Sequence, residues 1–122
     1  MLELYHSINS VCAQKIRIAL LEKGLEAKEH LMTLRGDQFD PVYMKLNPNA
    51  VVPTLIHDGN VIVESSIILY YLEDAFPEQP LMPTAPLDRV RARMFNKLID
   101  EYVHTSCMIS PSRLRFDPRF CA

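Results

Sequence analysis

The sequence has few cysteines, no long apolar run and no excess of positive charge, and each of these absences narrows the class of protein. Its 122 residues include three widely spaced cysteines, Cys12, Cys107 and Cys121, an odd number that predicts reduced thiols and no disulfide framework. No apolar run approaches the roughly 20 residues that span a bilayer, so no membrane partner is expected. The first residues lack the pattern of a secretory signal peptide, and we expect a cytoplasmic protein.

The charge balance disfavours nucleic acid as a partner. The chain has 13 basic and 15 acidic residues and a formal net charge of −2, whereas a protein that binds polyanions normally carries a clear positive excess. The charge is also divided unevenly, with 6 basic and 11 acidic residues before Leu87 and 7 basic and 4 acidic residues from Leu87 onward. The change coincides with a cluster of prolines. We therefore predict a domain at residues 1–77, a proline-rich linker at 78–86 and a second segment at 87–122.

Hydrophobic periodicity and turn signals predict the order of the elements. Ser10 can cap a helix that Gly24 ends, and Asp58-Gly59 between two β-branched runs is a strong hairpin signal. The predicted elements, in chain order, are strand 2–5, helix 11–23, strand 27–32, a short helix opened by Asp40-Pro41, strands 52–57 and 61–63, helix 64–76 and, after the prolines, helix 87–108.

The predicted order β-α-β-α-β-β-α with a terminal hairpin is typical of the thioredoxin-like α/β fold, in which the first β-α-β unit has a right-handed crossover and the last two strands pair antiparallel. The helix after the linker has nothing to pack against by itself. Its basic face is expected to be solvated, and its apolar stripe predicts self-association, most simply as a homodimer. The stripe is formed by Leu87, Val90, Met94, Leu98 and Tyr102.

Three segments of the predicted first domain carry distinctive motifs. They are residues 4–25, with Ser10 to Leu20 and Glu22-Lys23-Gly24-Leu25; residues 47–55, with Asn47-Pro48 and Val52-Pro53-Thr54-Leu55; and residues 64–73, with Glu64-Ser65-Ser66-Ile67 and Tyr70-Tyr71-Leu72-Glu73. Together they resemble the three signatures of the glutathione transferase superfamily. The resemblance covers residues 2–77 in the family's order and spacing. It implies a thioredoxin-like glutathione-binding domain followed by an all-helical domain, of which residues 87–122 are the incomplete start. Residues 93–102 resemble bacterial glutathione-dependent β-aryl etherases, whereas residues 111–122 match nothing in the family.

The resemblance implies which residues bind glutathione. Val52 precedes Pro53, a cis proline in this family, and its backbone would pair with the cysteinyl unit like a strand edge. Glu64 and Ser65 stand at a helix start, where Glu64 would meet the γ-glutamyl ammonium and Ser65 its carboxylate. Gln38 matches a glutamine that the zeta class uses for the glycine end of the ligand.

The resemblance also implies that Ser10 is the catalytic residue, because theta- and zeta-class enzymes carry a serine at this position and omega-class enzymes a cysteine. The pKa of a thiol, about 8.5, must fall by roughly 2 units for glutathione to be mostly thiolate at neutral pH, which is about 2.7 kcal/mol. A hydrogen bond to a charged group supplies about 1.5–3 kcal/mol and a helix amino terminus about 0.3–1 kcal/mol. One serine at a helix start is therefore sufficient.

Other interpretations stay open around this position. Ser10 can be a helix cap with no role in thiol chemistry, and Ser7 is the next hydroxyl in the same loop. Cys12 is interpreted as a buried structural cysteine, because Lys15 occupies the partner position of a Cys-x-x-Cys motif. The histidines show no metal-ligand spacing, so no metal site is expected. They are His6, His30, His57 and His104.

The sequence thus predicts a glutathione transferase-like enzyme that takes glutathione as co-substrate and activates its thiol for attack on an electrophilic small molecule. One alternative is a non-catalytic module that keeps this fold for protein contacts, which the intact glutathione residues oppose. Another is a glutaredoxin-like thiol reductase that uses Cys12, which the missing second cysteine opposes. Neither the electrophile nor the transferase class follows from the sequence.

Overall fold

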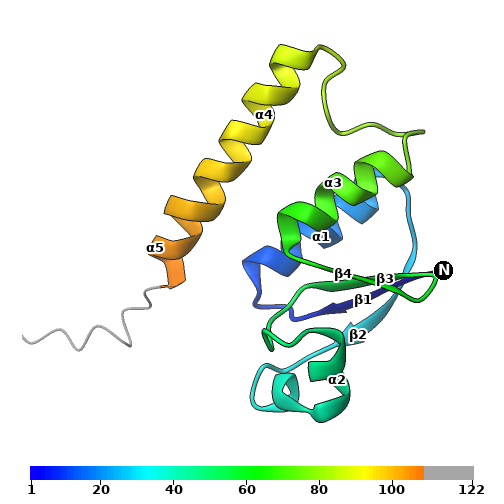
Figure 1. Ribbon diagram of the computed structural model, residues 1–122, viewed down its shortest axis with the longest axis vertical. Helices are drawn as coiled ribbons and strands as arrows, with labels where there is room; N and C mark the ends of the chain where they lie inside the picture. Colours follow the sequence, from blue (N-terminus) through cyan, green and yellow to red (C-terminus); the bar gives the residue numbers. More distant parts are fainter. Residues whose placement is uncertain (109–122) are drawn as a thin grey trace, which may run out of the picture. The chain divides into compact units, whose positions relative to one another are not determined.

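The computed structural model describes residues 1–108, so Cys121 and the unmatched tail at 111–122 lie outside the described residues. The chain separates into a first compact unit, residues 1–81, and a second unit that begins at Met82. The first unit is a four-stranded sheet with helices on both faces (Figure 1). Its elements are β1 (Leu2–His6), α1 (Val11–Glu22), β2 (Ala27–Leu31), the 3₁₀ helix η1 (Asp37–Phe39), α2 (Pro41–Leu46), β3 (Thr54–His57), β4 (Asn60–Val63) and α3 (Ser65–Ala75).

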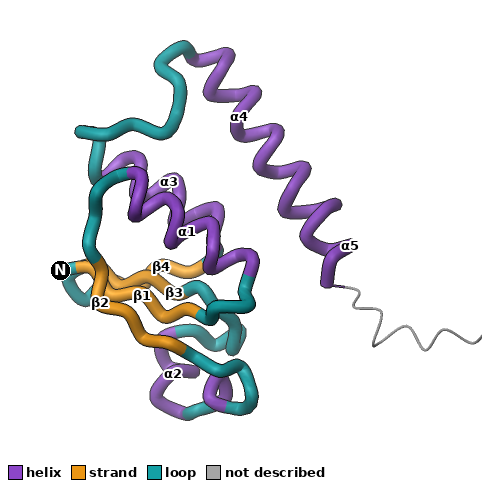
Figure 2. Tube along the Cα trace, turned by 180° about the vertical axis from the view of Figure 1, so that it is seen from behind, coloured by secondary structure: helices purple, strands orange, loops and turns teal. Residues whose placement is uncertain are grey.

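The sheet has the strand order β2-β1-β3-β4. Strand β1 pairs parallel with β2 and antiparallel with β3, and β3 pairs antiparallel with β4. Helices α1 and α3 cover one face and α2 lies on the other (Figure 2). The predicted thioredoxin-like fold is confirmed. Strand β3 begins at Thr54, two residues later than predicted, and Pro53 just before it has no N–H to donate to a ladder.

Two apolar clusters hold this unit together, one between the sheet and the helices α1 and α3, and one around Tyr43 of α2. The cluster between α1, α3 and the sheet contains Leu2, Leu4, Ile16, Ala19, Leu20, Leu55, Ile68 and Leu72. The cluster on the α2 side contains Ala13, Met32, Tyr43 and Val52, with Tyr5, Leu34 and Leu46 packed against it. The second cluster fixes α2 close to the segment that precedes β3.

Local signals set the ends of α1 and the hairpin. The Ser10 hydroxyl accepts the Ala13 N–H (3.2 Å) and caps α1. Gly24 follows the last turn with φ +65°, a left-handed conformation that costs glycine little. At the tip of the hairpin Asp58 and Gly59 both have positive φ, +49° and +82°, as a two-residue turn matched to the strand twist requires.

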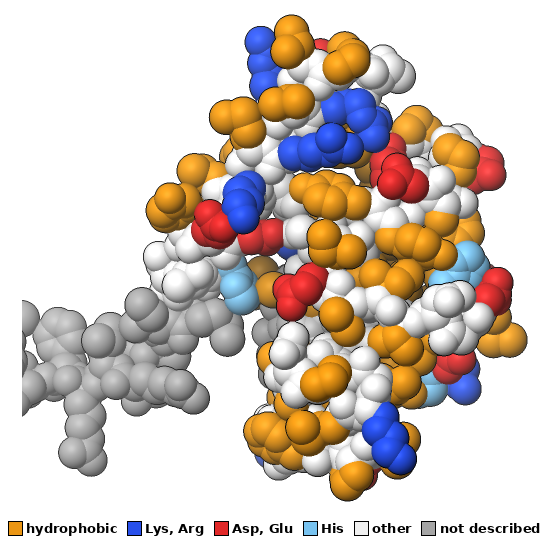
Figure 3. All heavy atoms as spheres, in the orientation of Figure 1, with side chains coloured by type: hydrophobic (Ala, Val, Ile, Leu, Met, Phe, Trp, Pro, Cys, Tyr) orange, Lys and Arg blue, Asp and Glu red, His pale blue; other side chains and the backbone are white. Residues whose placement is uncertain are grey.

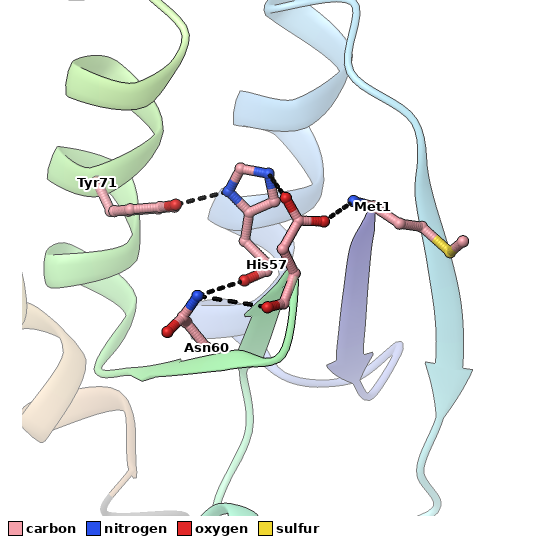
Figure 4. Close-up of polar contacts among 5 residues, drawn as sticks. Met1, His57, Asn60 and Tyr71 are labelled. Carbon is pink, nitrogen blue, oxygen red and sulfur yellow. Dashed lines mark hydrogen bonds and ion pairs between the residues drawn. The ribbon is translucent and has the colours of Figure 1, made fainter.

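The hairpin end of the sheet carries a paired polar cluster (Figure 4). The His57 Nδ1 lies 2.6 Å from the Tyr71 hydroxyl on α3, and its Nε2 lies 3.5 Å from the Asp58 carboxylate. The Asp58 carboxylate also pairs with the ammonium of Met1, and this bond lowers the pKa of Asp58 below its usual range. Asn60 donates to the backbone carbonyl of His57 (3.1 Å). The polar side chains at this end are thus engaged with one another.

The second unit contains one helical run. It consists of α4 (Pro86–Leu98), the π-helical segment η2 (Ile99–His104) and α5 (Thr105–Met108). None of the side chains of α4 is buried, and the predicted apolar stripe is exposed along the helix, together with lysines and arginines (Figure 3). Among residues 1–108 no helix has both the length and the apolar character needed to cross a membrane.

Candidate functional site

The pairing register brings the predicted site segments to one edge of the sheet. Tyr5, near the end of β1, pairs with Thr54 at the start of β3, and Thr54 pairs with Val63 at the end of β4. The loop after β1, the segment before β3 and the segment after β4 therefore meet at the carboxyl end of β1. This edge is opposite the hairpin cluster of Figure 4, since Leu2 pairs with His57 at the other end.

Ser10 is the more accessible of the two hydroxyls in the loop after β1. Its side chain is half-buried, whereas that of Ser7 is buried. The Ser10 oxygen accepts the Ala13 N–H as helix cap, which leaves the hydroxyl hydrogen available for donation. Cys12 is half-buried in the first turn of α1. The geometry therefore permits Ser10 to act both as cap and as donor.

The Val52–Pro53 peptide bond is cis, as the resemblance implies. Both side chains are buried, so this segment can offer a ligand its backbone and little else. It lies directly before β3, at the site edge.

A network of buried side chains brackets this segment on both sides. The Tyr43 hydroxyl donates to the Val51 carbonyl (2.5 Å) and lies 2.9 Å from Thr54 Oγ1. The Asn47 amide donates to the same two atoms, at 2.9 and 3.0 Å. Burial raises the pKa of Tyr43, which keeps its hydroxyl protonated. No role for Tyr43 is predicted from the sequence, because its partners are known only once α2 is placed beside β3.

Glu64 and Ser65 form the start of α3 at the same edge. Glu64 is exposed and has φ +68° and ψ 113°, a conformation uncommon for a residue with a side chain. Its carbonyl accepts the Ile68 N–H (2.9 Å), which is the first intrahelical bond. The N–H groups of the first turn have no partner within the helix and can face an anion.

Gln38 lies in η1, in the segment that follows β2, and the carboxyl end of β2 is beside that of β1 in their parallel pair. Its side-chain oxygen accepts the Gly36 N–H (2.9 Å), so only the NH₂ end of the amide can donate to a ligand carboxylate. The neighbouring Asp37 carboxylate accepts the Thr33 N–H (2.6 Å), and this bond lowers the pKa of Asp37. The loop is thus held by its own polar groups.

One contact between α1 and α3 was not foreseen. The Lys15 side chain is half-buried, and its ammonium donates to Ser66 Oγ (3.1 Å) in the first turn of α3. This places a cation between the helix starts that carry Ser10 and Ser65. No feature of the local sequence pairs residues 15 and 66.

Two pockets of the first unit lie away from the predicted residues. One of about 450 Å³ is lined by Tyr5, His30 and Asp37 among others, on the α2 side. Neither this pocket nor a wider one along α1 and β2 is lined by any of the six predicted glutathione and catalytic residues. Within residues 1–108, no group of three or more His, Cys, Asp or Glu side chains could hold a metal ion.

Comparison with known proteins gives the family. The family described as Glutathione S-transferase, N-terminal domain, matches residues 4–80. The chain belongs to the glutathione S-transferase family. The predicted resemblance is therefore confirmed, and the matched range contains all the site residues discussed above.

Individual members of the family are similar over the same region. The chain is 43% identical to Glutathione S-transferase 1 of Dianthus caryophyllus over 83 residues, which are 67% of this chain and 38% of that protein. It is 38% identical to the β-etherase LigF of Sphingobium, whose crystal structure superposes with a TM-score of 0.78 over 83% of this chain and 43% of that one.

A third relative was solved with glutathione present. It is the maleylacetoacetate isomerase of Methylobacterium extorquens, with malonate and glutathione bound, which is 36% identical. Its TM-score is 0.76 over 80% of this chain and 46% of that one. The chain thus spans less than half the length of each of these three glutathione S-transferase relatives.

Proposed function

We propose that this chain binds glutathione at the carboxyl end of β1 and activates its thiol for attack on an electrophilic small molecule. The observation that carries the proposal is the meeting of three segments at one edge of the sheet, those of Ser10, Val52-Pro53 and Glu64-Ser65. The first offers a hydroxyl, the second a buried segment with its backbone, and the third a helix start. These are the groups that a thiol, a peptide unit and an α-carboxylate respectively require.

Thiol activation falls to Ser10 in this proposal. The Ser10 oxygen already accepts the Ala13 N–H, so the hydroxyl hydrogen can be donated to the glutathione sulfur. This donation favours thiolate over thiol and lowers the pKa of the bound thiol. No metal or basic side chain is needed for the roughly 2.7 kcal/mol that a shift of about 2 units represents.

Calorimetric titration with glutathione tests the binding site. We expect the chain to bind glutathione measurably. We expect Ser65→Ala to weaken this binding by about 1–3 kcal/mol, because the γ-glutamyl carboxylate of glutathione loses a charge-assisted hydrogen bond. Ser106→Ala is a matched control, since the Ser106 hydroxyl donates to the Tyr102 carbonyl in the second unit. The absence of binding at millimolar glutathione would overturn the proposal.

Titration of the bound thiol, followed by the ultraviolet absorbance of thiolate, tests the chemistry. Ser10→Ala should raise the pKa of bound glutathione and slow conjugation at neutral pH with little change in affinity. Because alanine also removes the cap, Ser10→Asp is the sharper variant, since aspartate caps a helix and, when ionised, has no hydrogen to donate. Cys12→Ala should have little effect. If Cys12→Ala abolishes activity while both Ser10 variants retain it, a thiol reductase mechanism replaces this one.

Self-association and location complete the proposal. The exposed stripe of α4 supports a homodimer, because apolar patches of this kind seldom stay uncovered in a monomer. Light scattering at increasing concentration should show a mass above that of one chain, and a monodisperse monomer would contradict this. A cytoplasmic location stays a prediction.

A further inference from the structure

The buried network of hydrogen bonds around Val51 and Thr54 suggests a role for its side chains beyond packing. This role depends on the proposed glutathione site. Its donors come from α2 and from the residue after it, Tyr43 and Asn47, and its acceptors flank the Val52-Pro53 segment. The backbone expected to pair with the cysteinyl unit is thus held from both sides by buried side chains.

The hydrogens of this network can be assigned from chemistry. The Val51 carbonyl can only accept, so at 2.5 Å the single hydrogen of the Tyr43 hydroxyl lies between these two oxygens. The hydroxyl of Thr54, 2.9 Å away, must then donate to the Tyr43 oxygen. The Thr54 oxygen in turn accepts from Asn47. Each hydroxyl therefore donates once and accepts once, and the network leaves neither unsatisfied.

The side chains involved are among the most enclosed polar groups of the first unit. Asn47 and Thr54 are 1% and 0% exposed, and Tyr43 is buried with them. The Asn47 side-chain oxygen also accepts the Asn49 N–H (3.1 Å), so both ends of its amide are used. A buried network in which each member has its partners fixes one geometry, because every displacement leaves an unpaired group.

We propose that Tyr43, Asn47 and Thr54 are positioning residues that set the orientation of the Val52 backbone toward the cysteinyl unit of glutathione. In this proposal the three side chains do not contact glutathione. They affect only the binding of its cysteinyl unit, which pairs with the Val52 backbone. The γ-glutamyl unit is assigned to the start of α3, which this network does not contact through any of its hydrogen bonds described above. A defect in the network should therefore affect one part of the ligand selectively.

The test uses Tyr43→Phe with two ligands, glutathione and γ-glutamylmethylamide, which has the γ-glutamyl unit but no cysteinyl backbone. Phenylalanine removes one donor from Val51 and leaves the Thr54 hydroxyl without its acceptor. We expect the Kd of glutathione, measured by calorimetry on the folded variant, to rise about 3- to 10-fold, in the range of one lost hydrogen bond. The Kd of γ-glutamylmethylamide, measured by NMR titration, should stay within about 2-fold on the same reasoning.

Three further variants separate positioning from general stability. Tyr71→Phe is the matched control, because it removes a hydroxyl that contacts His57 at the opposite end of the sheet (Figure 4), and it should change neither Kd. Thr54→Val should reproduce the selective loss of glutathione affinity. Thr54→Ser, which keeps the hydroxyl, should retain glutathione binding.

The possible outcomes are distinct. If the unaltered chain binds no glutathione, the proposed function fails and this inference fails with it. If the unaltered chain binds and Tyr43→Phe is folded with unchanged glutathione affinity, only the positioning role is overturned. If Tyr43→Phe weakens both ligands equally, the network is a general structural element, and the inference is likewise wrong.

Discussion

Helices α3 and α4 have similar apolar patterns in the sequence and opposite surroundings in the structure. In α3, Ile68 and Leu72 are fully buried against the sheet and α1. In α4, the stripe that includes Met94 and Leu98 is exposed. The same periodicity therefore marks a core helix in the first unit and an uncovered surface in the described part of the second.

The comparison shows what periodicity can and cannot predict. It identifies the face of a helix that avoids water, because apolar side chains recur every three or four residues. It does not identify what covers that face. For α3 the cover is supplied within residues 1–81, and for α4 no described residue buries a side chain of the stripe.

The largest expected contrast between the two units concerns their ion pairs. In the first unit the Lys23 ammonium lies 2.9 Å from Glu73, with a side chain only 1% exposed, and it also donates to the carbonyls of Phe76 (3.0 Å) and Gln79 (2.9 Å). Lys23→Met leaves Glu73 buried without its cation, and we expect the free energy of unfolding to fall by about 3–5 kcal/mol. Urea denaturation followed by circular dichroism measures this loss.

The control is the exposed pair of Lys97 and Glu101 on the second unit, where the lysine side chain is 71% exposed. Lys97→Met should cost less than about 0.5 kcal/mol. A double variant, Lys23→Met with Glu73→Leu, removes the unpaired charge and should recover part of the loss. Equal costs for Lys23→Met and Lys97→Met would contradict the contrast between the units.

A matched pair of leucines gives the next largest effect. Leu72 in α3 is 0% exposed and Leu98 in α4 is 51% exposed. Leu72→Ala should lower the free energy of unfolding by about 2–5 kcal/mol through lost burial and a cavity, whereas Leu98→Ala, at concentrations low enough for the chain to be a monomer, should change it by less than about 0.5 kcal/mol. Thermal unfolding of both variants tests this. A loss for Leu98→Ala in the monomer as large as that for Leu72→Ala would contradict this contrast, whereas a loss that appears only as the concentration rises is the one that the proposed homodimer requires.

Much of the fold follows from local signals because each acts within a few residues. Ser10 caps α1 through an N–H three residues away, and the turn at Asp58-Gly59 needs only its own two φ angles. Lys23, at the end of the predicted helix 11–23, is buried. Its partner Glu73 was not predictable, since 50 residues of chain separate them and only the packing of α1 against α3 brings them together.

In the candidate site, too, some parts were predictable from the local sequence and others depend on tertiary contacts. Val52, Glu64 and Ser65 were predicted from segments that resemble the family, and the register brings their segments to one edge. The side chains that hold these segments were not predicted as such. Tyr43 reaches Thr54 across 11 residues and Lys15 reaches Ser66 across 51. Such contacts depend on tertiary structure, and no periodic pattern records them.

The smallest expected effect concerns the pH dependence of the first unit and arises at His6. This side chain is buried at the end of β1, and neither ring nitrogen has a hydrogen-bond partner. Burial is the main cause that lowers the pKa of His6; the Arg17 charge acts in the same direction, and Glu29, 3.8 Å from Nε2, opposes both. The folded protein thus binds a proton less readily at His6 than the unfolded chain, whose histidines titrate at about 6.5.

The sign of the pH effect follows from this difference. Between about pH 6.5 and the lowered pKa of His6 in the folded protein, the unfolded state binds more protons at His6 than the folded state does. The contribution of His6 to stability is therefore retained above this pH range and is lost progressively as the pH falls through it. His6→Leu removes this contribution. Melting temperatures of both proteins between pH 7.5 and 5 measure the difference, and other titrating groups cancel because both proteins share them. The stability of the unaltered chain relative to His6→Leu should decrease as the solution is acidified. A difference in melting temperature between the two proteins that stays constant with pH would show that the fold does not hold His6 neutral. It would also show that side chains of the first unit are less completely buried at the end of β1 than around Leu72.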